Sequence, residues 1–140
     1  MPKLLGPQRN PSAGGRPRHI VVLLHGVGAD GEDLIGLAPL LATHLPHALF
    51  VAPDAPYPCD MAPYGRQWFS LQDRRPDALL AGVGRVAPLL DAYLDELLHR
   101  HELDDRRLAL LGFSQGTMLA LFVAPRRRRP PAAVLGYSGA

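Results

Sequence analysis

The stretch LALLGFSQG at residues 108–116 decides the fold, because it joins an apolar run to a serine flanked by glycines. Residues 108–113 predict a buried strand, and the apolar run at 115–123 predicts a helix. Between them, Gly112-Phe113-Ser114-Gln115-Gly116 has the pattern G-x-S-x-G, which is typical of a sharp turn from strand to helix. Glycines two residues before and after the serine relieve crowding where a Cβ would strike neighbouring backbone. We therefore expect the serine to be held outward at this corner.

The position of Ser114 suits a nucleophile. At the start of a helix, unpaired backbone N–H groups and the positive end of the helix dipole favour a developing oxyanion. The N–H of Gln115 is the natural first donor. A second donor should follow an earlier strand, and the apolar run at 20–24 is followed by His25-Gly26-Val27-Gly28. We assign this role to the Val27 N–H; the alternative for the loop is a glycine-rich turn without chemistry.

Outward from these motifs, short apolar runs alternate with longer runs of helical period, which is typical of βαβ units around a mostly parallel sheet. The pattern predicts strands at 20–24, 48–52, 108–113 and 132–136, and helices at 33–45, from 76 to about 97, and at 115–123. It predicts an α/β fold with helices on both faces and about four strands. Residues 1–18, rich in proline and glycine, are expected to form a flexible leader before a domain at 19–140.

Four segments of the chain together form a recognisable set: VVLLHGVGADG at 21–31, PDAP at 53–56, GRQWF at 65–69 and GFSQG at 112–116. In these segments the chain resembles the phospholipase/carboxylesterase family, which includes the acyl-protein thioesterases. It implies the α/β-hydrolase fold, with Ser114 as the nucleophile of a serine esterase and the N–H groups of Val27 and Gln115 as its oxyanion hole. The implied motif glycines are Gly26, Gly112 and Gly116. Thr117 departs from the family pattern, which has glycine or alanine there, and we expect little effect.

The aromatic residues of the loop at 53–75 have two interpretations. In the first interpretation, an acyl-binding cleft is lined by Trp68 and Phe69 together with Met61 and Tyr64. In the second, these side chains pack onto the edge of the sheet. The family resemblance favours the cleft, with Trp68 and Phe69 binding the substrate.

The partners that Ser114 needs are missing from the expected place. In this fold the order along the chain is serine, then an acid, then a histidine, but residues 115–140 contain no Asp, Glu or His. We therefore expect an incomplete domain, truncated after about four strands, with very weak activity of its own. His25 is expected to order the oxyanion loop rather than to act as a base. The sequence leaves two functions open: a serine hydrolase of short to medium acyl esters or thioesters, and a non-catalytic ligand-binding or interaction protein with the same fold.

The composition sets limits on partners. The chain has 140 residues, 47% hydrophobic and 20% charged, which predicts one soluble globular domain. A net charge of only +2 gives no reason to expect a nucleic-acid partner, and no apolar stretch approaches the roughly 20 residues that span a bilayer. Cys59 is the single cysteine, which fits a reducing, cytoplasmic setting. We expect a small acyl ester or thioester as substrate and no cofactor.

Two charged clusters are interpreted without a ligand. Asp30, Glu32 and Asp33 suit the first turn of a helix, so no metal is implied. The arginines at 126–129 are expected to form a solvated connector rather than a phosphate site. The last predicted strand, at 132–136, would expose an apolar edge and face, and we expect a homodimer or aggregation through that surface.

Overall fold

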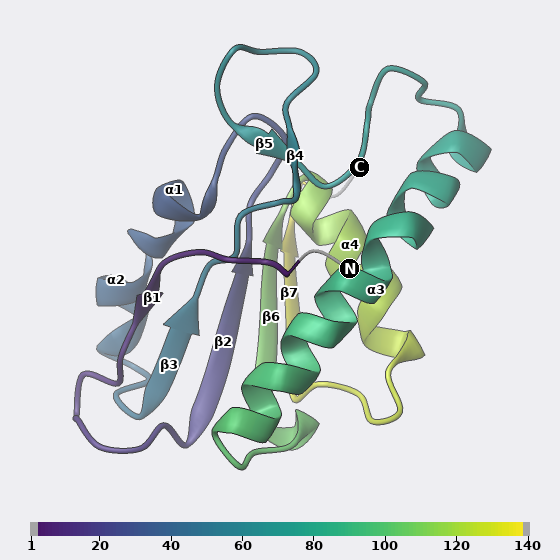
Figure 1. Ribbon diagram of the computed structural model, residues 1–140. Coiled ribbons are helices and arrows are strands. Elements are labelled where there is room, and N and C mark those ends of the chain that lie inside the picture. Colours follow the sequence, from purple (N-terminus) through teal and green to yellow (C-terminus); the bar gives the residue numbers. More distant parts are fainter. Residues whose placement is uncertain (1–2, 139–140) are drawn as a thin grey trace.

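A computed structural model describes residues 3–138, which form a five-stranded sheet of order β1-β3-β2-β6-β7 (Figure 1). The strands are β1 Gln8–Arg9, β2 His19–Leu24, β3 Ala48–Val51, β6 Leu108–Phe113 and β7 Ala133–Tyr137. The last four are parallel, and β1 is antiparallel at the edge. The predicted α/β fold with a mostly parallel sheet is therefore confirmed.

Helices cover both faces of the sheet (Figure 1). They are α1 Gly31–Ile35, α2 Ala38–Ala42, α3 Pro76–Arg100 and α4 Gln115–Val123. Two short 3₁₀ turns are η1 Asp105–Arg107 and η2 Ala124–Arg126. A small hairpin consists of β4 Tyr57–Pro58 and β5 Arg66–Gln67. Alternate residues of β2 enter two cores: Ile20, Val22 and Leu24 lie with α3 and α4, whereas Val21 and Leu23 lie with α1 and α2. Burial on both faces explains why this strand is continuously apolar. None of the helices within residues 3–138 combines the length and the apolar character needed to cross a bilayer.

The predicted single helix at 33–45 is wrong. The structure has two short helices, α1 and α2, and Gly36 ends the first of them. Pro39 lies in the first turn of α2 and lacks the N–H that a continuous helix would need to bond the carbonyl of Ile35. The leucine spacing was helical, but the proline decides where the helix can continue.

The segment expected from its composition to be a flexible leader contacts the sheet where the structure describes it. Leu4 is buried, β1 pairs with β3, and the N–H groups of Ala52 and Asp54 donate to the carbonyls of Pro7 and Leu5. These are backbone hydrogen bonds to a sheet edge, which do not require an apolar run in the leader.

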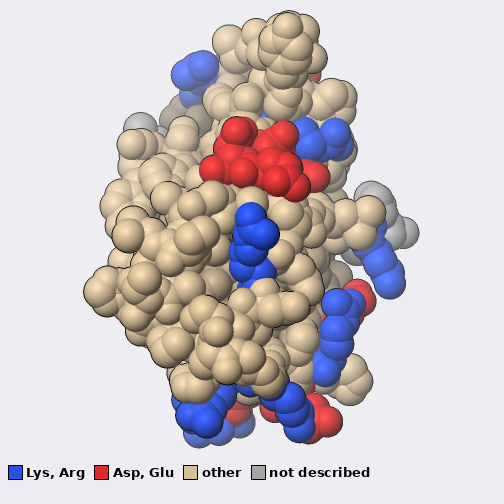
Figure 2. All heavy atoms as spheres, turned by 90° about the vertical axis from the view of Figure 1, so that its left-hand side faces the viewer, with Lys and Arg blue, Asp and Glu red and all other residues tan. Residues whose placement is uncertain are grey.

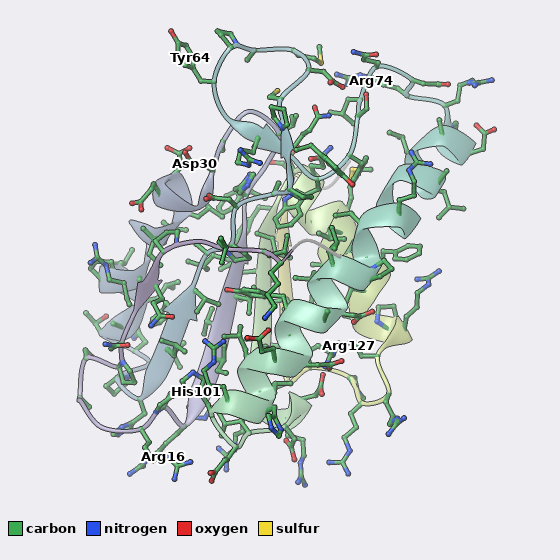
Figure 3. All side chains as sticks on the ribbon, in the orientation of Figure 1. Arg16, Asp30, Tyr64, Arg74, His101 and Arg127 are labelled. Carbon is green, nitrogen blue, oxygen red and sulfur yellow. The ribbon has the colours of Figure 1, made fainter. Side chains whose placement is uncertain are left out.

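The arginine connector is only partly solvated. Arg126, Arg128 and Arg129 are exposed, as expected, but the side chain of Arg127 is only 6% exposed. It donates to carboxylates of Asp91, Asp95 and Asp105. Burial by itself lowers the pKa of Arg127, but the hydrogen bonds to Asp105 and Asp95 outweigh it and raise the pKa. Arg127 thus joins the connector to α3 and η1, and Figure 3 shows it beside α3.

The N-terminus of α4 lies against the C-terminal end of β2. A Cβ on Gly116 would lie 2.0 Å from the carbonyl oxygen of Leu24, and a Cβ on Gly112 would lie 2.6 Å from the backbone of Gly116. Real Cβ atoms do not approach backbone so closely, so both positions require glycine for steric reasons.

Substitution of alanine for glycine should have opposite effects on stability at this crowded position and at an open one. Gly116→Ala should lower the free energy of unfolding by about 2 kcal/mol or more, because α4 must move away from β2. Gly84→Ala, in the exposed part of α3 where nothing lies within 4 Å of the added Cβ, should raise it by about 0.5–1 kcal/mol. Urea denaturation followed by circular dichroism measures both, and equal stability of Gly116→Ala and wild type would show that α4 does not approach β2 this closely.

Candidate functional site

Ser114 lies at the predicted corner, between the end of β6 and the first residue of α4. Its backbone has φ 51° and ψ −112°, a conformation that costs a non-glycine residue free energy and that marks many functional sites. Its N–H donates to the carbonyl of Tyr137 at 2.7 Å, and its carbonyl accepts from Met118, so both neighbouring elements hold it. The residue as a whole is exposed to solvent.

The loop after β2 lies directly beside this serine. A Cβ on Gly26 would lie 3.3 Å from the Cβ of Ser114, so the loop and the corner are in contact. The hairpin β4–β5 holds the far side of the loop, because the Gly28 N–H donates to the carbonyl of Arg66 and the Arg66 N–H donates to that of Ala29. Gly65 also needs its small size here, since a Cβ on it would lie 2.1 Å from the carbonyl oxygen of Gly28.

The two proposed oxyanion donors are on these two neighbouring segments. Gln115 is the first residue of α4, and an N–H at that position has no acceptor within its own helix. Val27 is the residue after Gly26 in the contacting loop. Among the backbone hydrogen bonds between loops and other elements of residues 3–138, none is donated by Val27 or Gln115.

His25 is fully buried and orders the loop, as expected. Its Nε2 lies 2.9 Å from the N–H of Ala55 and its Nδ1 lies 2.7 Å from the carbonyl oxygen of Gly26. A backbone N–H only donates and a carbonyl only accepts, so the ring is neutral with its proton on Nδ1. Burial lowers the pKa of His25 below its usual 6.5, although the Gly26 carbonyl and Asp54 oppose this shift. With both nitrogens engaged, this imidazole has no free lone pair for a substrate.

The expectation that Trp68 and Phe69 line a cleft is wrong for this structure. Their exposed fractions are 0% and 3%, and both belong to the core that α3 and α4 share. The indole N–H of Trp68 donates to the carbonyl of His25 at 2.9 Å. Of the other two loop residues, Met61 is 64% exposed, and Tyr64 is 80% exposed and points away from the sheet (Figure 3). Both aromatic side chains therefore pack into the core between the sheet and the two helices, which neither interpretation described.

Thr117 has a larger role than the sequence indicated. Its hydroxyl lies 2.7 Å from the carbonyl oxygen of Gly112 and 2.8 Å from that of Tyr137, and it accepts the N–H of Tyr137. Its methyl group packs at Gly136, where a Cβ would lie 2.5 Å away. Thr117 therefore links α4 to the end of β7. The one signal in the sequence for the contact between Thr117 and β7 was a threonine near the start of the predicted apolar helix.

The remaining polar groups among residues 3–138 supply neither a base hydrogen-bonded to Ser114 nor a group of metal ligands. No hydrogen bond joins the Ser114 hydroxyl to another residue between Lys3 and Ser138. Asp30 and Asp33 form a capping box at the start of α1, and the acidic patch near this helix is visible in Figure 2. In the described part of the chain, no three His, Cys, Asp or Glu side chains are grouped to hold a metal ion.

Comparisons with known proteins identify the family of the chain. A family model described as Phospholipase/Carboxylesterase matches residues 11–140. Esterase YpfH of Escherichia coli (strain K12) is 30% identical over 104 residues, which cover 74% of this chain and 44% of that protein.

Solved structures give the same result. The crystal structure of esterase PE8 is 41% identical with a TM-score of 0.88, and the match covers 94% of this chain and 62% of that one. A carboxylesterase from Mesorhizobium loti is 29% identical with a TM-score of 0.58, over 80% of this chain and 50% of that one. The chain thus spans less than two thirds of the length of each of these relatives. On the family match, the relatives and the fold together, the chain belongs to the phospholipase/carboxylesterase family.

Proposed function

We propose that this chain carries the nucleophile and the oxyanion hole of a serine carboxylesterase that cleaves short to medium acyl esters or thioesters. Ser114 is the nucleophile, and the N–H groups of Val27 and Gln115 stabilise the oxyanion. The observation that carries the proposal is the exposed Ser114 with φ 51° at a strand–helix corner, in contact with the loop of Gly26. Membership of an esterase family supports the same chemistry.

In the proposed reaction, Oγ of Ser114 attacks the acyl carbonyl carbon while a base takes the hydroxyl proton. The carbonyl oxygen becomes anionic and accepts hydrogen bonds from the two N–H groups, which are already oriented before the reaction. Collapse of the intermediate expels the alcohol or thiol, which takes up the proton, and leaves the acyl group on Ser114. Water then attacks this acyl-enzyme in the same way and releases the carboxylic acid.

The chain supplies no evident base for these steps. His25 uses both ring nitrogens within the fold, and residues 115–140 contain neither an acid nor a histidine. Loss of triad members typically removes most of the rate but leaves about 10³- to 10⁴-fold over water. We propose that these 140 residues on their own are a very weak esterase; the alternative is a ligand-binding protein without turnover.

An added base should reveal the nucleophile. With imidazole in solution and p-nitrophenyl butyrate as substrate, wild type should release p-nitrophenol faster than imidazole alone, with saturation in ester. Ser114→Ala should reduce this release to the rate of imidazole alone, because the attacking oxygen is lost. The release of p-nitrophenol is followed by absorbance.

Ser70→Ala is the matched control, since Ser70 is an exposed serine bonded to Asp60, and it should keep the wild-type rate. A rate with Ser114→Ala equal to that of wild type would refute the nucleophile. Ester binding without any Ser114-dependent turnover or labelling by a fluorophosphonate would favour the ligand-binding alternative.

The proposal extends to the kind of substrate and to the location of the protein in the cell. Substrates of the acyl-protein thioesterase and lysophospholipase kinds fit the acyl chemistry of Ser114, since a thioester and an oxygen ester both present an acyl carbonyl carbon to a hydroxyl nucleophile. The single Cys59 and the absence of any need for a disulfide fit a cytoplasmic location.

We further propose that the chain self-associates through the apolar face of β6 and β7. Leu111 and Phe113 are paired in register with Leu135 and Tyr137, so all four side chains lie on one face. Leu135 is 49% exposed and Tyr137 is 48% exposed, and the rings of Phe113 and Tyr137 stack at 5.1 Å. A contiguous apolar surface of this kind is typical of an interface.

Light scattering after gel filtration tests the association. We expect a mass of about twice 15.2 kDa for wild type, and a monomer for Leu135→Glu, because a carboxylate on that face opposes burial. Leu80→Glu is the control, since Leu80 on α3 is 58% exposed and lies on the opposite side of the sheet. A monomeric wild type at high protein concentration would contradict the proposal.

A further inference from the structure

We infer that Gln115, through its side chain, and Trp68, through its indole, are positioning residues that hold the two oxyanion N–H donors at a fixed separation. This inference rests on the proposed function and deepens it. Hydrogen bonds lead from α4 through Trp68 to His25, two residues before Val27, without passing through Ser114.

The first link is the amide side chain of Gln115, the same residue whose backbone N–H is the first donor. This side chain is only 1% exposed, and a buried amide without partners would cost free energy. Its Oε1 accepts the backbone N–H of Trp68 at 2.7 Å, and its Nε2 donates to the carbonyl of Phe69 at 2.6 Å. Because one partner only donates and the other only accepts, the orientation of the amide is fixed. The start of α4 is thereby tied to residues 68 and 69 at two points.

The second link runs from Trp68 to the loop of Val27. The indole N–H donates to the carbonyl of His25, and the two rings lie 5.3 Å apart between centroids. The His25 ring continues the path, since its Nδ1–H donates to the carbonyl of Gly26 and its Nε2 accepts from Ala55. Gly26 is bonded covalently to Val27, so the path ends at the peptide group that carries the second donor.

Such a restraint matters because the loop itself is permissive. Gly26 and Gly28 flank Val27, and Gly28 has φ 83°, so the backbone has more freedom here than it would with larger residues. Oxyanion stabilisation depends on donors that are oriented before the reaction, and a misplacement of about 1 Å can cost about 10²-fold in rate. Trp68 and the Gln115 amide supply a rigid reference between the helix and the loop.

Two substitutions interrupt the path at different places. Gln115→Met keeps the length of the side chain but removes both of its hydrogen bonds, and Trp68→Phe keeps an aromatic ring but removes the indole N–H. The control is Gln67→Met, because Gln67 is also buried, ends β5 directly before Trp68 and accepts the N–H of Asp60 through its side chain instead. Circular dichroism establishes that each variant is folded, and either path variant alone is sufficient for the test.

The first measurement does not depend on activity. Trp68 is the single tryptophan of the chain, so its indole N–H gives one resonance in a ¹H–¹⁵N spectrum. We expect Gln115→Met to increase the hydrogen-exchange rate of this N–H at least about tenfold, and Gln67→Met to leave it unchanged. Unchanged exchange in Gln115→Met overturns the inference, whatever the outcome for Ser114.

The second measurement is the imidazole-dependent hydrolysis of p-nitrophenyl butyrate. Gln115→Met and Trp68→Phe should lower kcat by about 10²-fold with KM within about twofold of wild type, because substrate binding does not need the oxyanion donors. Gln67→Met should match wild type. A loss in KM with unchanged kcat, or no loss at all, overturns the positioning role. Absence of Ser114-dependent turnover in wild type would be a failure of the proposed function instead, and the indole measurement would still test the link.

Discussion

The contact between the start of α4 and the end of β2 is the constraint on which the rest of the site depends. Gly116 lies so close to the carbonyl of Leu24 that no side chain fits between them. This approach turns the chain sharply after β6 and forces Ser114 into a conformation with positive φ. It also brings the loop after β2 against the serine, so one steric condition assembles both halves of the site.

A small buried polar network stabilises this arrangement inside an apolar core. The Gln115 amide, the Trp68 indole and the His25 ring are almost fully buried, and each of their polar groups has a partner. Among the described residues no buried side-chain nitrogen or oxygen lacks a hydrogen bond. Because an unsatisfied group would be costly in such surroundings, the network favours one relative placement of helix and loop. Packing provides the stability, and the polar groups provide the orientation.

The two sides of the sheet differ in how they are covered. β2 is covered by helices on both faces, whereas β7 has residues that are half exposed on the face of α1 and α2. Thr117 strengthens the connection of β7 to the rest of the sheet, because its hydroxyl bonds backbone groups of both Gly112 and Tyr137. The corner at Ser114 therefore depends on β7 as well as on β2, since the Ser114 N–H also donates to Tyr137.

Local features of the sequence were sufficient to predict the strand–helix corner at Ser114. The strand at 108–113, the helix at 115–123 and the glycines around Ser114 follow from short-range pattern and sterics, and the structure has these bounds. The parallel pairing of most strands and the coverage of both faces also follow from apolar runs separated by helical periods, whereas the order of the strands in the sheet does not. Pro39 was a local signal as well, and it outweighed the leucine spacing that predicted one long helix.

Only the tertiary structure decided the partners of groups that are distant along the chain. Trp68 lies in the core that α3 and α4 share, where its indole N–H finds a carbonyl 43 residues away. The guanidinium of Arg127 is buried among carboxylates that lie 22 to 36 residues away. The leader pairs with β3 through backbone hydrogen bonds, which leave no mark in side-chain composition. By itself, the sequence determined the four parallel strands, the long helix that begins at Pro76 and the serine between its glycines, because short-range sterics and periodicity act within a few residues. The fold decided which polar groups meet, because hydrogen bonds between distant residues depend on three-dimensional placement.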